Sequence, residues 1–312
     1  MSGLGRMVKG ALLVGAGGLL ARTALKALRE SPAAGELERI NHRGATVSLA
    51  AGPALAVAAS TTAAAGAGSP AIASAALVAG LGSGAVGLYD DVVGQRPDQK
   101  TAKGFKGHLS ALREGRVTSG LVKIAGIGVS ALVAASLVGR QRRHAADRDY
   151  AAGFSGSAAG SGAGRAGDVK AGPGSAGQVA DLVIDTGLIA GTANLANLFD
   201  LRPGRALKVG LTVAGPLGSA GNTSLLSGPT GAASALLRED LDEQVMLGDS
   251  GANAWGALLG LAAANRRSRI GRLAMLAGVV GLTLASEKVS FTQVIESTPG
   301  LRDFDAWGRR TS

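Results

Sequence analysis

The sequence predicts an all-α, polytopic integral membrane protein with about nine transmembrane helices, folded as a single domain over residues 1–312. Hydrophobic residues make up 46% of the chain, and the mean hydropathy is +0.25 although 50 residues are glycine. Charged residues are gathered in short segments between apolar runs. The run from Ser69 to Leu88 carries no charge, and its roughly 20 residues are the length that a helix needs to cross about 30 Å of hydrocarbon.

Nine apolar runs are the predicted spans, and Ala, Gly, Ser and Val dominate them. They cover residues 7–27, 45–66, 69–89, 119–139, 178–198, 206–221, 223–238, 250–265 and 270–287. The first run begins beside Arg6 and Lys9 and lacks a small-residue cleavage signal, so we interpret it as a span rather than a removable signal peptide. The many glycines allow close contact between helices, and packing is their default explanation.

Two segments of the second half differ from the other runs. Asp181 and Asp185 lie one turn apart in the fifth run, and ionisable groups at membrane depth usually face a polar interior. We expect Asp181 at the membrane surface, and Asp185 either as a hydrogen-bonding residue between helices or as part of a polar pathway. Residues 151–176 are almost entirely Gly, Ala and Ser, which predicts a flexible outer loop over 140–177.

The charge and the residue types exclude several classes of function. A net charge of +10 could indicate nucleic-acid binding, but the basic residues lie between apolar runs and the chain has only two Trp, two Tyr and five Phe to stack on bases. We therefore assign the positive charge to anionic lipid and anionic substrate, and expect no nucleic-acid partner. Without cysteine, disulfides, thiolate catalysis and cysteine-built metal sites are excluded, and three scattered histidines argue against a histidine-built zinc site.

The orientation follows from alternation of the spans. With residues 90–118 in the cytoplasm, the N-terminus lies outside and the C-terminal tail inside. Lysine and arginine are moderately more numerous in the segments that this arrangement places inside, in agreement with the positive-inside rule. The sequence thus predicts a multi-pass protein of the plasma membrane whose polar clusters face the cytoplasm.

The first polar cluster begins with Asp90 and Asp91 at the foot of the third span. Adjacent carboxylates raise each other's pKa unless cations compensate, so a purely structural helix end gains little from the pair. Two solvated acids that end a span are the alternative. Downstream, Lys103, Lys106 and His108 are spaced by glycines that let a loop fold over an anion, the alternative being a solvated basic loop.

The second polar cluster follows the fifth span. Asn194, Asn197 and Asp200 are three residues apart and share one face of a helix, and Pro203 and Gly204 then break that helix. Arg202 precedes this break, and Arg205 and Lys208 follow it. Oxygen ligands suit magnesium and guanidinium groups bind phosphate, so this pattern suits a metal-bound diphosphate. A capped helix end with anchoring arginines is the structural alternative.

The third polar cluster runs from Asp240, Asp242 and Glu243 through Gly248-Asp249-Ser250-Gly251 to Asn253, at the start of the eighth span. An acid at that position complements the helix dipole, so capping alone would explain Asp249. However, alternation of the spans places all three clusters at the same face of the membrane. Capping does not explain that convergence.

With these motifs in order, the sequence resembles the polyprenyl-phosphate N-acetylhexosamine-1-phosphate transferases, over most of its length. Asp90-Asp91 is similar to the family's acid pair, the segment from Asn194 to Asp200 to its Asn-Asn-Asp segment, and Asp249 with its glycines to its Gly-Asp-x-Gly magnesium site. The segment from Glu287 to Gln293 resembles the one that closes the family's last conserved helix. Any one motif is weak, and the four together at helix ends are fairly specific.

The resemblance implies transfer of a sugar-1-phosphate from a UDP-sugar to polyprenyl phosphate, with release of UMP, in cell-envelope glycan biosynthesis. It implies catalytic roles for Asp90, Asp91 and Asp200, and a metal ion held by Asp249, Mg²⁺ with Mn²⁺ as the alternative. The substrate-binding residues that it implies are Asn194, Asn197, Lys103, Lys106, His108, Arg202, Arg205 and Gln293. The expected partners are the two substrates and the membrane, with a homodimer as a possible assembly.

Two departures from the family pattern bear on activity. The family continues its Asn-Asn-Asp segment as Asp-Gly-x-Asp-Gly, whereas Asp200 is followed by Leu-Arg-Pro-Gly, so Pro203 replaces the second aspartate. A histidine-rich motif of the muramoyl-pentapeptide branch is also absent from the sequence. The resemblance therefore implies a divergent member. An inactive relative that binds polyprenyl phosphate or a partner enzyme is the alternative, and a transporter, suggested by Asp185, is a third.

Overall fold

The computed structural model describes residues 3–41, 43–96, 110, 113–115, 117–158 and 174–310, and within them the chain is almost entirely helical. The eleven α-helices of this described part are α1 (Gly3–Arg29), α2 (Ala51–Gly66), α3 (Pro70–Val93), α5 (Ser119–Ala158), α6 (Ser175–Phe199), α7 (Arg205–Leu217), α8 (Thr223–Leu241), α9 (Gly248–Ala264), α10 (Arg269–Ser286), α11 (Phe291–Ser297) and α12 (Pro299–Ala306). A 3-10 turn (Ala34–Leu37), a π turn (Gly218–Asn222) and a hairpin of β1 (Glu38–Ile40) and β2 (Thr46–Ser48) complete it. The predicted all-α class is confirmed.

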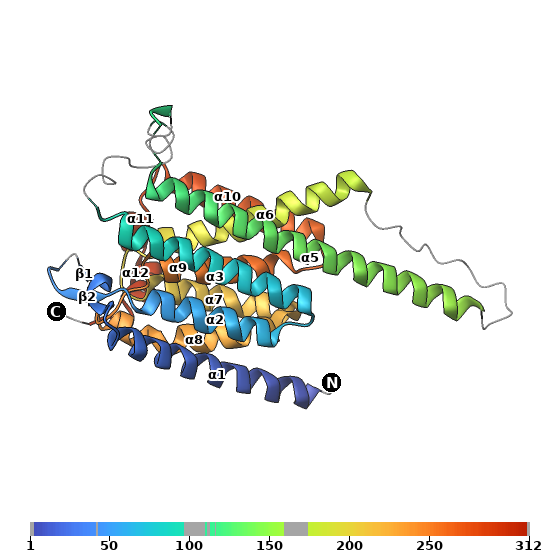
Figure 1. Cartoon of the computed structure of the whole chain (residues 1–312), viewed down its shortest axis with the longest axis horizontal. Helices are drawn as coiled ribbons and strands as arrows, with labels where there is room; N and C mark the ends of the chain where they lie inside the picture. Colours follow the sequence, from blue (N-terminus) through green and yellow to red (C-terminus); the bar gives the residue numbers. More distant parts are fainter. Residues whose placement is uncertain are drawn as a thin grey trace.

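The long helices lie side by side, and the chain passes back and forth between the two ends of the bundle (Figure 1). We call the end that carries β1, β2, α11 and α12 the hairpin end, and the opposite end the far end. The N-terminus lies at the far end and the C-terminus at the hairpin end (Figure 1). Helices α3, α6 and α8 finish at the hairpin end, where α5, α7 and α9 begin. The three polar clusters therefore reach the same end, as alternation predicted.

Five of the described helices are long and apolar enough to cross a membrane: α1, α3, α5, α6 and α10. Helix α10 packs mainly against α6, and large apolar side chains such as Ile270 (81% exposed) and Leu284 (63%) lie on its surface. Apolar exposure on this scale is costly in water and natural in lipid. The five helices thus indicate a multi-pass membrane protein. The other predicted spans correspond to α2, α7, α8 and α9.

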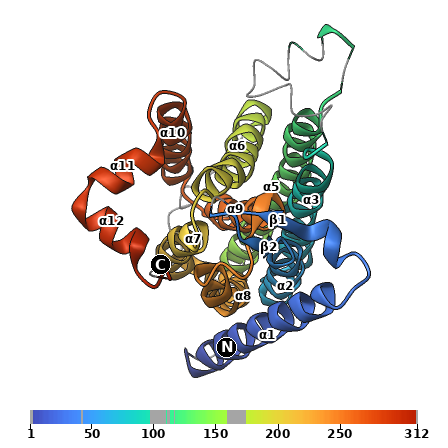
Figure 2. The same cartoon turned by 90° about the vertical axis from the view of Figure 1, so that its left-hand side faces the viewer.

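Helix α9 is the centre of the bundle, with α2, α3, α6, α7 and α8 arranged around it (Figure 2). Almost every residue of α9 is buried, including Trp255. The close packing depends on glycine, because a Cβ added at Gly260 would lie 2.5 Å from the backbone oxygen of Leu188 in α6. Small residues at such contacts let helix backbones approach, which is how helices associate where lipid removes most of the hydrophobic effect.

Two predicted boundaries were wrong. Helix α5 continues to Ala158, whereas the span was expected to end at 139 and a flexible loop to follow over 140–177. The extension is rich in Ala and Arg, which are good helix formers; residues 159–173 lie outside the described part. The second span starts at Ala51 rather than 45, because residues 46–48 pair with 38–40 across a turn in which the Asn41 side chain accepts two backbone N–H groups.

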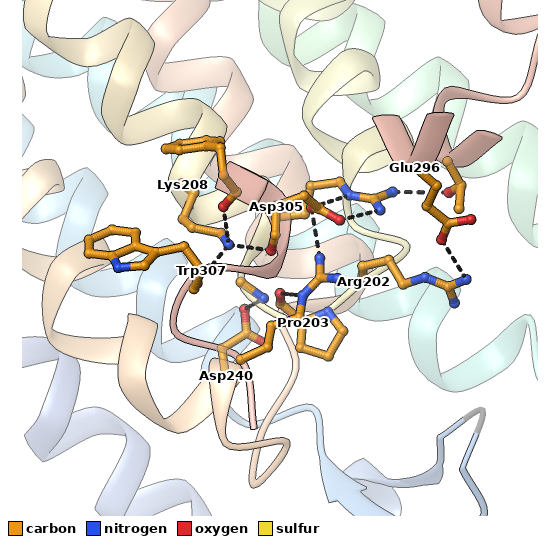
Figure 3. Close-up of polar contacts among 12 residues, drawn as sticks. Arg202, Pro203, Lys208, Asp240, Glu296, Asp305 and Trp307 are labelled. Atoms are coloured by element: carbon orange, nitrogen blue, oxygen red, sulfur yellow. Dashed lines mark hydrogen bonds and ion pairs between the residues drawn. The ribbon is translucent and has the colours of Figure 1, made fainter. Parts of the chain in front are cut away.

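The predicted C-terminal tail contains two short helices, α11 and α12, and we call residues 287–310 the C-terminal arm. Buried Arg205 at the start of α7 donates to both carboxylate oxygens of Asp305, at 2.7 and 2.8 Å (Figure 3). The Lys208 ammonium donates to the backbone oxygens of three arm residues, Phe304, Asp305 and Trp307. The arm is thus fixed to α7 by a compact polar network.

The carboxyl group of Asp305 is acidified by this network. Burial alone would raise the pKa of Asp305, but the guanidinium groups of Arg205 and Arg309 outweigh that effect, and the net pKa lies below the usual aspartate value. Docking of the arm therefore depends on an ionised Asp305.

Removing the carboxylate should release the arm. Asp305→Ala leaves the buried guanidinium of Arg205 without its partner, which costs about 3–5 kcal/mol. We expect faster proteolysis of the C-terminal arm and a lower melting temperature in detergent. Asp303→Ala is the matched control, because Asp303 is 70% exposed and pairs only with exposed Arg302. Equal protease resistance of the two variants would contradict the assignment.

Acid should release the arm as well. An acid whose folded-state pKa is lowered contributes stability that is present above the ordinary aspartate pKa of about 3.9 and is lost as the pH falls through the lowered value. Hydrogen exchange of residues 299–307 should therefore accelerate below about pH 4 in the native protein. In Asp305→Asn, exchange there should already be fast at pH 7 and change little with pH; a native-like acid transition in this variant would assign the effect to another group.

Candidate functional site

A cavity of about 1560 Å³ opens at the hairpin end of the bundle. Its walls come from the hairpin, the ends of α3 and α6, the starts of α5 and α9, and the last turns of α10. Among the residues predicted from sequence, those that line the cavity are Asp90, Asp91, Asn194, Asn197, Asp200, Arg202 and Asp249. Described residues of all three polar clusters therefore meet in one place, although Arg205 and Lys208 of the second cluster are not among the lining residues.

Asp91 joins α3 to the first turn of α9. Its two carboxylate oxygens accept the backbone N–H groups of Asp249, at 3.0 Å, and Ser250, at 2.9 Å. The preceding Gly248 has a φ of 58°, and a Cβ added there would lie 2.9 Å from both oxygens of Asp91. Glycine at 248 therefore permits both the backbone turn and the approach of the carboxylate, and a carboxylate at a helix N-terminus is favourably placed.

Lys123 of α5 lies between two of the acids. Its ammonium is 2.7 Å from Oδ2 of Asp90 and 2.6 Å from Oδ2 of Asp249, and all three side chains are largely but not fully buried. Two carboxylates that approach one another at low dielectric repel strongly unless a cation lies between them. Lys123 supplies that cation and fixes the positions of Asp90 and Asp249.

Asp200 and Asp240 form a second acidic pair on the other side of the cavity. Burial raises the pKa of Asp200 well above its usual value, the negative charges of Asp240, Asp91 and Asp249 raise it further, and the backbone N–H of Gly248 opposes them. Asp240 accepts the backbone N–H of Gly204 at 3.1 Å, and Gly204 has a φ of 71°. The Pro203-Gly204 break thus turns the chain back over the cavity and is fastened there by Asp240.

The cavity also extends toward the middle of the bundle. Its lining on that side is mainly apolar and small, and comprises Ile124, Ile127 and Gly128 of α5, Ala190 and Gly191 of α6, and Thr283 of α10. These three helices are among the five of membrane length. An acidic mouth and an apolar extension suit a ligand with a charged head and a hydrocarbon chain.

The donor chemistry of the mouth fits a hard divalent cation. No group of three acidic or histidine side chains among the described residues surrounds a single point. Mg²⁺ does not need such a cage, since it is commonly held by one or two carboxylates together with substrate phosphates and water. Asp249, whose Oδ2 is already paired with a cation, and Asp200, whose charge is uncompensated, provide that number of ligands.

Several predicted site residues are placed elsewhere. Arg205 faces Asp305 and the arm, and Gln293 is an exposed residue of α11; neither is among the described residues that line the cavity. Arg205 lies away from the cavity because its guanidinium group forms a buried ion pair with Asp305. Lys103, Lys106 and His108 lie outside the described part of the chain.

Lys123 and Arg39 line the cavity but were not singled out from the sequence, and Asn253 of the third polar cluster lines it without having been predicted as a site residue. Lys123 could have been found from the sequence, because it is the only charged residue in the run 119–139. A lone charge in a span indicates function. Asn253 follows Asp249 by one helical turn, and its buried Nδ2 has no hydrogen-bond partner in the described residues. Arg39 donates to the backbone oxygen of Asp91 at 2.5 Å. No pattern in the sequence marks it as a residue of the site.

The acids of the fifth span belong to a different cluster. Fully buried Asp185 pairs with Arg142 of α5 at 2.7 Å, and Arg272 of α10 pairs with Asp181 at 2.5 Å. This cluster lies in the half of α6 nearer the far end, away from the cavity. Asp185 therefore makes contacts between helices. These contacts explain why an acid lies in this span, which the sequence had suggested as part of a polar pathway.

Comparison of the chain with protein-family models, with curated proteins and with solved structures finds no match in any of the three. The cavity and its charges are therefore the grounds on which a function can be argued.

Proposed function

We propose that this protein transfers a sugar-1-phosphate, as N-acetylhexosamine-1-phosphate, from a UDP-sugar to polyprenyl phosphate and releases UMP. The observation that carries the proposal is the meeting of Asp90, Asp91, Asp200 and Asp249, from three distant segments, in one cavity. The reaction joins a water-soluble diphosphate to a lipid, so it needs an acidic, cation-binding mouth beside an apolar extension. The cavity has both.

The proposal places the protein in the plasma membrane with nine spans and its hairpin end in the cytoplasm, where UDP-sugars are made. The N-terminus and C-terminus at opposite ends of the bundle support an odd number of crossings (Figure 1). The moderate excess of lysine and arginine in the segments predicted to be inside supports the orientation.

The proposed step is a phosphoryl transfer. An oxygen of the lipid phosphate forms a bond to the β-phosphorus of the UDP-sugar, and the bond from that phosphorus to the bridging oxygen breaks. The bridging oxygen leaves with UMP, and the product is a polyprenyl diphospho-sugar. Because the second pKa of a phosphate monoester is near 6, the nucleophile is largely ionised at neutral pH, so positioning matters more than a general base.

Each acid has a different environment and therefore a different proposed role. Asp91, with both oxygens engaged by backbone N–H groups, holds the first turn of α9 and so positions Asp249. Asp249 and Asp200 would hold Mg²⁺, which neutralises the diphosphate and orients the leaving group. Asn194 and Asn197 line the wall between them and offer amide groups to the sugar nucleotide.

Lys123 and Asp90 set the charge of the empty mouth. The ammonium of Lys123 compensates Asp249 and Asp90 before substrate arrives. A phosphate group that enters with its metal ion brings both a cation for Asp249 and an anion for Lys123. Lys123 then remains beside Asp90 and donates to a phosphate oxygen, a role that guanidinium and ammonium groups commonly play in phosphoryl transfer.

Binding without catalysis is the second candidate, and Pro203 is the observation that favours it. Pro203 lines the cavity at the position where the resembling family has its second aspartate, and proline offers neither a ligand oxygen nor an N–H. A protein of this kind would bind polyprenyl phosphate or a partner enzyme through the same cavity. Binding of lipid phosphate without release of UMP would identify it.

Neutralising the proposed metal ligand should abolish turnover. Purified protein with Mg²⁺, polyprenyl phosphate and a panel of UDP-N-acetylhexosamines should release UMP, and Asp249→Asn should lower kcat by on the order of 10²-fold or more, because stabilisation of the transferring phosphate is lost. Asp242→Asn is the matched control, since Asp242 pairs with exposed Arg238. Full activity of Asp249→Asn would refute the assignment, and inactivity of the native protein with every sugar would favour the binding protein.

Removing the cation between the acids should make the fold depend on metal. Lys123→Met leaves Asp90 and Asp249 without compensation, so the melting temperature without metal should fall, and Mg²⁺ should restore more of it than it adds to the native protein. Lys26→Met, at a side chain that is 76% exposed, is the control. Thermal unfolding in detergent over a range of Mg²⁺ concentrations measures both the melting temperature without metal and its increase with Mg²⁺. An equal response to Mg²⁺ in all three proteins would exclude the proposed exchange of cations.

A further inference from the structure

Large apolar side chains are exposed both on α10 and in the C-terminal arm. On α10 they include Leu282 (47% exposed) and Leu284 (63%), and in the arm Val289 (47%), Leu301 (48%) and Trp307 (69%). Exposure of α10 is natural because that helix is of membrane length. The arm has no such length, so its exposed apolar side chains require a separate explanation.

Some polar groups of the arm face the bundle, whereas others, such as Arg302 and Asp303, are exposed. Asp305 and the backbone oxygens of residues 304, 305 and 307 are bound by Arg205 and Lys208. Figure 3 shows the indole of Trp307 extending away from this network, while its backbone oxygen remains within it. The exposed indole is therefore the outermost apolar group of the arm, presented by a backbone that is held in place.

The two sides of α12 have opposite character. Leu301 and Phe304 are three residues apart and lie on one side of the helix, with Phe304 beneath the Lys208 ammonium at 5.6 Å. Arg302 and Asp303 lie on another side and pair with each other in the open, at 59% and 70% exposure. This distribution is that of a helix lying between an apolar and an aqueous phase.

The position of the arm agrees with such a boundary. Viewed from the hairpin end, α11 and α12 lie beside the bundle, at its edge next to α10 and α7 (Figure 2). They also lie at the level where the membrane-length helices finish (Figure 1). A segment at that level and beyond the edge of the bundle is next to the headgroup region of the surrounding bilayer. Trp is the residue that most favours this region.

We propose that the C-terminal arm is an interfacial membrane-binding element, with Leu301, Phe304 and Trp307 seated at the boundary between headgroups and acyl chains. The proposed partner is the lipid bilayer itself. The inference does not depend on the transferase activity, since it rests on the arm and on α10 alone. The arm is also connected to the cavity, because Arg309 donates to the backbone oxygen of Pro203, which lies near Asp200 in the sequence.

The chain is suited to a direct test, because it contains only two tryptophans and the other, Trp255, is fully buried in α9. The full-length protein is placed in nanodiscs of ordinary or brominated phosphatidylcholine. The emission of Trp307 is obtained as the difference between the native protein and Trp307→Phe. We expect brominated lipid to remove most of this difference signal, while aqueous iodide removes little of it. The remaining Trp255 signal reports whether the variant has kept its core.

A displaced tryptophan provides the matched control. In the variant Trp307→Phe with Arg302→Trp, the new indole lies on the water-facing side of α12, and we expect quenching by iodide and little quenching by brominated lipid. Quenching of native Trp307 by iodide rather than by brominated lipid would overturn the proposal in favour of a solvated arm. Protection from both quenchers would also overturn it, because a protein surface would then cover the arm.

Discussion

The structure depends on one carboxylate that accepts two backbone N–H groups. Asp91 at the end of α3 binds the first turn of α9, and α9 is the helix around which the others pack. This contact fixes the axial position of α9 relative to α3, and with it the place of Asp249. It also explains two glycines, since Gly87 makes room for the backbone of Asp249 and Gly248 for the carboxylate itself.

Several clusters of buried acids in this fold are neutralised by cations from neighbouring helices. At the hairpin end, Lys123 compensates Asp90 and Asp249, and Arg205 compensates Asp305. Nearer the far end, arginines of α5 and α10 compensate the acids of α6. Asp200 differs from these acids, because the charges that act on it are the negative ones of Asp240, Asp91 and Asp249, whereas Asp240 is also influenced by the cations Arg309 and Lys208.

The sequence was sufficient for the fold class and for the meeting of the acids, because each polar cluster ends or begins an apolar run and alternation determines the face. It was insufficient where the partner is distant: the pairing of Arg205 with Asp305 joins residues 100 positions apart, and no local pattern reveals it. The extent of α5 was missed because residues 140–148 carry several charges, which end the apolar run but not the helix. Lys123 was overlooked because a lone charge was treated as part of an apolar run.

The ammonium of Lys123 has a consequence for how the protein is made. A newly inserted chain must bring its helices together before any ligand is bound, and a bare pair of carboxylates would oppose that assembly. The ammonium of Lys123 compensates both carboxylates within the polypeptide, so this repulsion is reduced without any bound ligand. The polypeptide thus supplies, in Lys123, a counter-ion for Asp90 and Asp249 as soon as its helices assemble.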